Sequence, residues 1–243
     1  MTFQSLKKRK QKQNQFLGIW ITLPSPEVCE VLGHSGLDFA ILDLEHGTFD
    51  LPTLGHCVRA LQLTGAVPIV RIPEISSTIV QNVLDLGVDG LVVPQVKSNE
   101  CVNQVFKLMN YAPEGTRGYN PFIRGELYGP NREREKPFLS IIIENKQAFE
   151  NLPAIAGNPV VDMVYLGVYD MSVHLGCPGE VENQKIKDFV ASSISILKEK
   201  GKSVGLLVKS PKEYQEWASV GIEFLVYGTD TLLLSTELRA LKK

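Results

Sequence analysis

Eight short runs of aliphatic and β-branched residues recur along the chain, and polar or charged residues directly follow most of them. The runs are continuously apolar rather than alternating, which is typical of parallel strands that are buried on both faces. They cover residues 18–22, 38–46, 67–73, 90–96, 138–145, 162–172, 203–208 and 223–228.

Segments with helical periodicity and suitable caps separate these runs. Ser25 followed by Pro26 predicts the start of one helix, Asp50 predicts the cap of the next, and Gly87 is placed as a C′ glycine. Each strand therefore has its own following helix, so we predict an α/β fold, a (βα)8 TIM barrel, with residues 1–243 forming a single domain. An open doubly wound sheet shares this alternation, but no Gly-rich dinucleotide fingerprint follows any run. Later helices are expected over residues 146–155, 183–200, 211–220 and 230–241.

Composition narrows the class of partner. Apolar residues make up 44% of the chain, yet no apolar run approaches the roughly 18 residues that would span a membrane. A formal net charge of −2 argues against nucleic acid as the main partner, because phosphate binding needs a basic surface. The four cysteines are scattered and form no C-x-x-C pair, which argues against a zinc or disulfide framework.

The first 15 residues are basic but are not followed by the apolar segment of a secretory signal, so we expect a cytoplasmic protein. We expect residues 1–15 to form a basic N-terminal helix or tail with a solvated charged face, and a binding arm is the alternative. A second segment, from Pro113 to Pro137, is too rich in Gly, Pro and Asn for a helix or strand. Because loops of this length are usually functional or mobile, we expect it at the rim near the active site.

Two carboxylates follow neighbouring strands. Glu144 and Asp170 come at the ends of the fifth and sixth runs, and like charges on one rim repel each other unless a cation lies between them. Carboxylate oxygens without His or Cys favour Mg²⁺ or Mn²⁺. The alternative is that each residue is a helix cap or an ion-pair partner.

A guanidinium and an imidazole follow two other runs. Arg71 ends the third run, where its planar fork is suited to holding a carboxylate, and a structural ion pair is the alternative. His46 directly follows Glu45, with Asp43 nearby, and an imidazole beside carboxylates is a plausible general base. A satisfied polar histidine is the alternative.

Taken together, these motifs resemble the HpcH/HpaI aldolase/citrate lyase family, class II pyruvate aldolases of the phosphoenolpyruvate/pyruvate superfamily. The resemblance covers nearly the whole chain, and the order and spacing of its motifs are more specific than any single one. The motifs are GIWITLPSPE, LDLEHG, VRIPE, LDLGVDGLVVPQV, YAPEGTRGYN, IIIEN, GVYDMS and LVYGTDTLLLS.

The resemblance implies a role for each matching residue. Glu144 and Asp170 resemble the family's metal ligands, for Mg²⁺ or Mn²⁺ with Co²⁺ as a further option. Arg71 resembles the arginine that holds the oxo acid, and His46 resembles the catalytic base. The remaining positions are Trp20 as the aromatic wall beside the pyruvate methyl, Gly167 as a backbone contact to the substrate carboxylate, Asp43 as an acid that orients the histidine, and Asp85 as a second such acid from a neighbouring subunit.

The resemblance further implies a carbon–carbon lyase that cleaves or forms a 4-hydroxy-2-oxo acid, giving pyruvate and an aldehyde through a metal-stabilised enolate. It also implies a homo-oligomer, a hexamer or trimer, in which the C-terminal helix packs on a neighbour. Two positions depart from the family pattern: Ile142 stands where relatives commonly have Gln, and Val168 where they have Pro. Loss of the amide removes a hydrogen-bonding group near the metal, which leaves the aldol partner open.

Three alternatives remain at this point. One is a condensing enzyme of the same family that forms citrate or acts on a CoA thioester. A Schiff-base aldolase using Lys97 or Lys209 is a second, and a non-catalytic barrel that serves as a binding subunit is the third.

Overall fold

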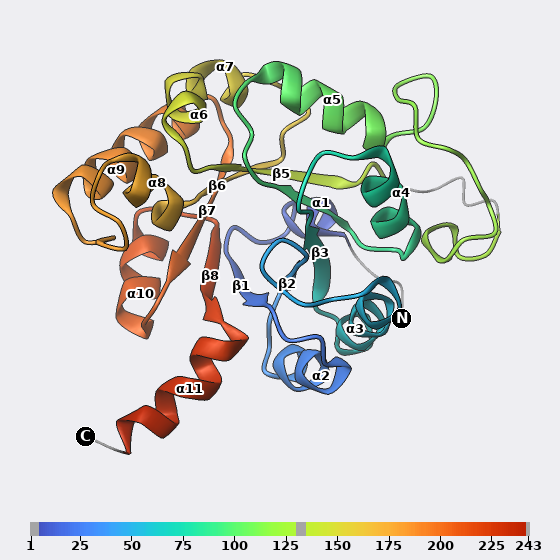
Figure 1. The fold of residues 1–243 in the computed structure, drawn as a ribbon, viewed down its shortest axis with the longest axis horizontal. Coiled ribbons are helices and arrows are strands. Elements are labelled where there is room, and N and C mark those ends of the chain that lie inside the picture. The colour runs from blue at the N-terminus through green and yellow to red at the C-terminus, as the bar shows by residue number, and fades with distance from the viewer. Residues whose placement is uncertain (1–4, 130–134, 242–243) are drawn as a thin grey trace.

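A computed structural model describes residues 5–129 and 135–241, and in it eight parallel strands close into a barrel in sequence order. This confirms the predicted TIM barrel. Figure 1 shows the helices arranged around the strands. The strands are β1 (Phe16–Ile21), β2 (Phe39–Asp43), β3 (Val67–Arg71), β4 (Gly90–Val93), β5 (Phe138–Ile143), β6 (Met163–Leu166), β7 (Ser203–Val208) and β8 (Phe224–Thr229).

The helices follow the strands as the sequence predicts. Ser25 and Asp50 accept hydrogen bonds from the backbone N–H groups of Val28 and Thr53, so both predicted N-caps are confirmed. Gly87 has a φ of +81°, the left-handed conformation expected of a C′ glycine. Among the described residues, no helix is long and apolar enough to cross a lipid bilayer. The helices outside the barrel are α2 (Pro26–His34), α3 (Leu51–Thr64), α4 (Ser77–Asp85), α5 (Asn99–Met109), α6 (Lys146–Glu150), α7 (Leu152–Ala156), α8 (Val168–His174), α9 (Gln184–Glu199), α10 (Pro211–Ser219) and α11 (Asp230–Ala240).

The sixth apolar run is shorter as a strand than the sequence predicts. The chain leaves the sheet at Gly167 and enters α8, so Asp170 lies in the first turn of a helix and not at a strand end. Strand and helix are both apolar here, because Val168 and Met171 continue the run. Hydrophobicity alone therefore does not mark the boundary.

Two buried clusters stabilise the barrel. One lies between the strands and the surrounding helices, and the other fills the barrel interior. In the interior, the rings of Phe16 and Phe224 stack with centroids 4.6 Å apart, and Phe39 and Phe138 pack against Phe224. Gly18 faces these rings, and a side chain there would collide with Phe39.

The short helix α1 (Leu6–Arg9) closes the amino-terminal end of the barrel. Leu6 is fully buried in the interior cluster, and its backbone N–H donates to Asp89. Lys7 pairs with Asp162 at 3.0 Å, and Arg9 donates to the backbone carbonyls of Asp38 and Gly65. The expected charged face is therefore solvated only in part: Lys8 is exposed, whereas Lys7 and Arg9 attach the helix to loops that precede the strands.

The segment from Pro113 to Pro137 does not lie at the predicted rim. It connects the end of α5 to the start of β5, so it returns to the amino-terminal end of the barrel. There Arg117 pairs with Asp85, and Arg124 donates to Gln62. Arg132 and Arg134 lie outside the described residues. We expected a functional loop because of its length. A segment that runs from the end of a helix to the start of a strand lies at the opposite end of the barrel from the carboxyl ends of the strands, and so does the described part of this one.

Candidate active site

A cavity of about 300 Å³ lies at the carboxyl ends of the strands. This is the end at which TIM barrels carry their chemistry. The cavity brings together most of the predicted site residues, and its lining comes from seven of the eight strands and the segments after them. It is lined by Trp20, Thr22, Asp43, His46, Arg71, Ile142, Glu144, Tyr165, Leu166, Gly167, Val168, Tyr169, Asp170, Leu207 and Thr229.

Arg71 is held at the end of β3 by two carboxylates. Its Nε and Nη2 atoms donate to both oxygens of Asp43, at 2.8 and 2.5 Å, and its Nη1 lies 3.0 Å from Glu45. The guanidinium also lies over the ring of Trp20, 4.5 Å from its centroid. Burial acts to lower the pKa of Arg71, but its hydrogen bonds and charge interactions with Asp43 and Glu45 outweigh it and raise the pKa. The planar fork is thus fixed in orientation as well as in charge.

Asp43 also organises the turn that carries His46. Its Oδ1 atom accepts the backbone N–H groups of Glu45 and His46, at 3.0 and 3.2 Å. The imidazole is exposed and faces the cavity, and within the described part of the chain no hydrogen bond joins it to Asp43. The aspartate therefore positions the histidine through the backbone, and its expected role toward the ring remains a prediction.

Glu144 directly follows β5 and is 2% exposed. One of its oxygens accepts the backbone N–H of Gln95 at 2.5 Å, from a residue whose φ of +53° is in the left-handed region. The pKa of Glu144 is raised to about 7, first by burial and then by the nearby carboxylates of Asp170 and Glu45, which together outweigh the opposing effect of Gln95 and Arg71. A buried carboxylate surrounded by other carboxylates is one that a cation would stabilise.

The donor groups fit a hard divalent cation. Across residues 5–129 and 135–241, no group of three His, Cys, Asp or Glu side chains converges as a ready metal centre. Glu144 and Asp170 do line the same cavity, and the charge of Asp170 contributes to the raised pKa of Glu144. Mg²⁺ is commonly held by one or two carboxylates, with water and substrate oxygens completing its shell, so two ligands suffice.

Gly167 packs directly against Glu144. An added Cβ at this position would lie 2.6 Å from the Glu144 Cβ and 2.9 Å from Ile142. Its N–H already donates to the carbonyl of Ile143 at 3.0 Å, so this group is not available to a substrate carboxylate. The structure therefore explains the glycine at this position by the lack of space for a side chain. The predicted reason was a backbone contact to the substrate.

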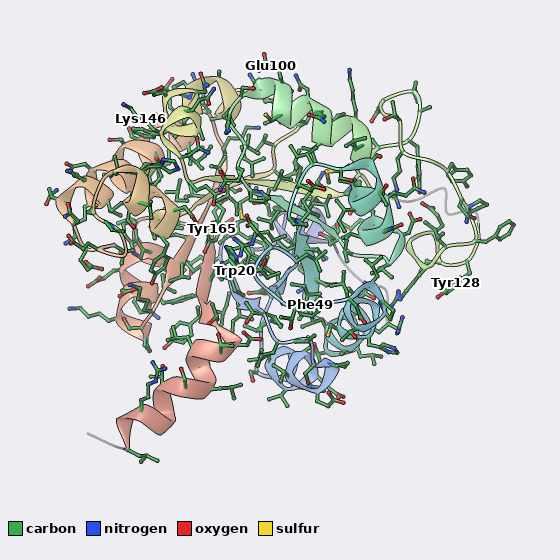
Figure 2. The ribbon with its side chains drawn as sticks, viewed as in Figure 1. Trp20, Phe49, Glu100, Tyr128, Lys146 and Tyr165 are labelled. Atoms are coloured by element: carbon green, nitrogen blue, oxygen red, sulfur yellow. The ribbon has the colours of Figure 1, made fainter. Side chains whose placement is uncertain are left out.

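Trp20 has a partner that the sequence analysis missed. Its indole N–H donates to the hydroxyl of Tyr165 at 2.9 Å, and the two rings meet edge to face at the centre of the barrel (Figure 2). Tyr165 lies within an apolar run and so resembles a core residue in sequence. Gln95 was missed as well, although a polar residue two positions after a buried strand is a usable signal.

Asp85 is the one predicted site residue that does not line this cavity. It ends α4, near the amino-terminal side of the barrel, where it accepts a hydrogen bond from Arg117 at 2.5 Å. The role expected of Asp85 on a neighbouring subunit therefore remains a prediction.

One wall of the cavity is apolar. Ile142 is 2% exposed and lies two residues before Glu144, so both side chains point into the barrel. Leu207 and Val168 extend this wall toward β7 and α8. The cavity therefore combines a charged side, which contains Arg71 and Glu144, with a hydrophobic one.

The sequence profile of the HpcH/HpaI aldolase/citrate lyase family matches residues 17–236. The chain belongs to this family, and it is accordingly a carbon–carbon lyase. It is 28% identical to a hydroxypyruvate/pyruvate aldolase of Roseobacter denitrificans, with 95% of this chain and 92% of that protein covered. It is 28% identical to a 2-keto-3-deoxy-L-rhamnonate aldolase of Escherichia coli K12, with 96% and 89% covered.

Solved structures agree with this assignment. An HpcH/HpaI family protein from Burkholderia cenocepacia J2315 superimposes with a TM-score of 0.90 at 23% identity, covering 98% of this chain and 97% of that one. A citrate synthase structure gives a TM-score of 0.88 at 28% identity, with 98% and 96% covered. The first comparison supports the fold, and the second shows that this barrel also serves a condensing enzyme.

Proposed function

We propose that this protein is a metal-dependent class II aldolase. It would cleave a 4-hydroxy-2-oxo acid to pyruvate and an aldehyde, or form the acid from these two compounds. The proposal is carried by the convergence of Glu144, Asp170, Arg71 and His46 on one cavity. Aldolases among its relatives, at 28% identity over nearly the whole chain, support the same reaction class.

Glu144 and Asp170 would hold the divalent cation, Mg²⁺ or Mn²⁺. When bound, the cation would supply positive charge for the oxygen on which the enolate charge develops. Arg71 would donate to an oxygen of the 2-oxo acid, and its bonds to Asp43 and Glu45 keep the guanidinium oriented before substrate arrives. This preorganisation lowers the cost of ordering the site during the reaction.

His46 would act as the general base. In cleavage it would take the proton of the C4 hydroxyl, and in synthesis it would take a proton of the pyruvate methyl. Its exposed imidazole faces the cavity from a turn that Asp43 holds by its backbone, which suits a group that exchanges protons with water. Trp20 would form the wall beside the methyl group.

The test is a His46→Ala variant assayed by release of pyruvate from a 4-hydroxy-2-oxo acid. We expect kcat to fall about 10²- to 10⁴-fold, while the fold measured by circular dichroism stays the same. His56→Ala is the matched control, because His56 is exposed on α3, where its imidazole pairs with Arg59, and it does not line the cavity. Turnover equal to wild type in His46→Ala would refute the assignment.

Removing the metal with a chelator distinguishes a metal-dependent aldolase from one that forms a Schiff base. EDTA should abolish activity, and Mg²⁺ or Mn²⁺ should restore it. Activity that survives EDTA but is trapped by borohydride would instead point to a lysine, and Lys209 directly after β7 is the candidate.

A condensing enzyme is the second candidate, favoured by the 28% identity to a citrate synthase of the same fold. Such an enzyme would use the same enolate chemistry on a different acceptor. Measuring pyruvate release beside the consumption of oxaloacetate and of an acyl-CoA thioester distinguishes the two.

A further inference from the structure

A second cavity, a groove of about 750 Å³, begins beside the candidate active site and runs between α9 and α10. Its inner wall is formed by apolar side chains, among them Trp217, Val190 and Leu206. Charged side chains line it as well, three lysines and three glutamates: Lys187, Lys209, Lys212, Glu182, Glu213 and Glu216. Figure 1 shows the two helices next to each other outside β7.

The groove adjoins the active-site cavity. Val168 and Leu207 line both spaces, so these two side chains form the partition between them. Tyr169 lines the first cavity and Lys209 the second, and the ammonium group of Lys209 lies 5.5 Å from the centroid of the Tyr169 ring. Both α9 and α10 begin after loops at the carboxyl end of the barrel, so the mouth of the groove opens at the same rim as the site.

We propose that this groove binds the chain of the acceptor aldehyde, and that the substrate class is a 4-hydroxy-2-oxo acid with an extended apolar tail. The inference rests on the proposed aldolase function and adds to it a preference for one class of aldehyde. In synthesis, C3 of the pyruvate enolate forms a bond to the aldehyde carbon. The electron pair of the C=O π bond moves to the oxygen, which takes up a proton, and the tail stays attached to this new C4.

The dimensions and the chemistry of the two spaces support this division. A cavity of about 300 Å³ is at the small end for a ligand site, sufficient for pyruvate and a short aldehyde. The wall shared by the two spaces carries the apolar side chains of Leu207 and Val168. A hydroxylated tail that crosses these two side chains would lose its water there without gaining hydrogen bonds from them.

The experiment measures aldol addition of pyruvate to acetaldehyde, propanal, butanal, pentanal and hexanal. For the wild-type protein we expect kcat/KM to rise roughly threefold for each methylene added, because each one buries apolar surface in the groove. Ala191→Trp fills the groove from an exposed position of α9, so it places no bulk in the core. We expect this variant to lower the ratio of kcat/KM for hexanal to that for acetaldehyde about tenfold.

Ser195→Trp is the matched control, since Ser195 is exposed on the same helix, one turn further on, and outside the groove. It should keep the wild-type ratio. Equal loss in both variants, or no dependence on chain length in the wild type, overturns the proposal. A change of molecular mass in Ala191→Trp alone also overturns it, because the groove would then be an interface between copies.

Deuterium exchange of the pyruvate methyl, followed by NMR without any aldehyde, tests the proposed aldolase function separately from the groove assignment. Exchange that depends on metal and on His46 supports the proposed aldolase. If exchange occurs but long aldehydes are not preferred, only the groove assignment fails. If wild-type protein with Mg²⁺ or Mn²⁺ shows no exchange, the proposed function fails and takes the groove assignment with it.

Discussion

The Glu144 carboxyl connects the acid–base balance of the site with the stability of the fold. Burial and neighbouring carboxylates raise its pKa from 4.5 to about 7. Below pH 4.5 it is protonated in both the folded and the unfolded chain. Between the two values the unfolded chain ionises and the folded one does not, so the metal-free protein should lose stability as pH rises toward 7.

We therefore expect the free energy of unfolding of metal-free protein to fall by up to about 3 kcal/mol between pH 4.5 and 7.5 through this group. Urea unfolding in EDTA at several pH values measures it. Glu144→Gln cannot ionise, and its profile should be flatter by that amount. Identical profiles for the two proteins would contradict the assigned pKa. Added Mg²⁺ should stabilise the wild type more at pH 8 than at pH 6, because the cation binds the ionised form.

Gly167 gives a steric test of the same group. In Gly167→Ala the new Cβ must displace Glu144, from which it would be separated by only 2.6 Å. We expect metal affinity, measured by isothermal titration, to fall about tenfold or more, since a misplaced ligand costs roughly 1–3 kcal/mol. Gly157→Ala is the control, because a Cβ there meets its neighbours at ordinary contact distance. Unchanged affinity in Gly167→Ala would show that Glu144 does not hold the cation.

At the scale of the element, α1 acts as a plug for the barrel. Leu6 is fully buried against the interior cluster, and the helix is only four residues long, so tertiary contacts and not helix propensity hold it in place. We expect Leu6→Ala to lower the free energy of unfolding by about 3 kcal/mol. Leu63→Ala, at a position that is 78% exposed on α3, should change it by less than about 0.5 kcal/mol. Equal effects of the two substitutions in urea unfolding would contradict a stabilising role for Leu6 at the end of the barrel.

The same element shows where sequence reasoning fails. The strands and most helices were predictable, because their periodicity and caps are local features of the chain. What α1 does depends on charges distant in sequence, such as Asp162 and Asp89, and no local pattern reveals such pairing. The predicted helix over residues 146–155 is likewise divided at Asn151 into α6 and α7, two residues before Pro153.

In the candidate site too, features that are local in sequence were predictable and contacts between distant residues were not. Glu144, Arg71 and His46 were predictable, since charged residues after buried strands of a barrel must meet at one rim. Tyr165 was not, because its hydroxyl has a partner only once β6 and β1 are brought into the same interior. The left-handed Gln95 that binds Glu144 was hidden for a similar reason: its conformation is set by the fold and not by its residue type.

At the scale of the whole molecule, α11 extends away from the barrel (Figure 1). Its base is fixed, because the buried Asp230 accepts the backbone N–H groups of Thr22 and Leu23. Beyond this anchor, Leu234 is 59% and Leu241 is 84% exposed. Exposed leucines on a projecting helix are typical of a surface that a partner covers.

We expect the wild-type protein to be a trimer or hexamer of the 26.9 kDa chain by light scattering, and Leu234→Asp to shift it to a smaller species. Burying a charge without a partner costs more than an interface of this kind can offset. Leu63→Asp, at a leucine on α3 that is more exposed than Leu234, should leave the mass unchanged. Because Asp85 lies outside the cavity of its own chain, the smaller species should also lose activity; a fully active monomer would show that Asp85 contributes nothing from a neighbour.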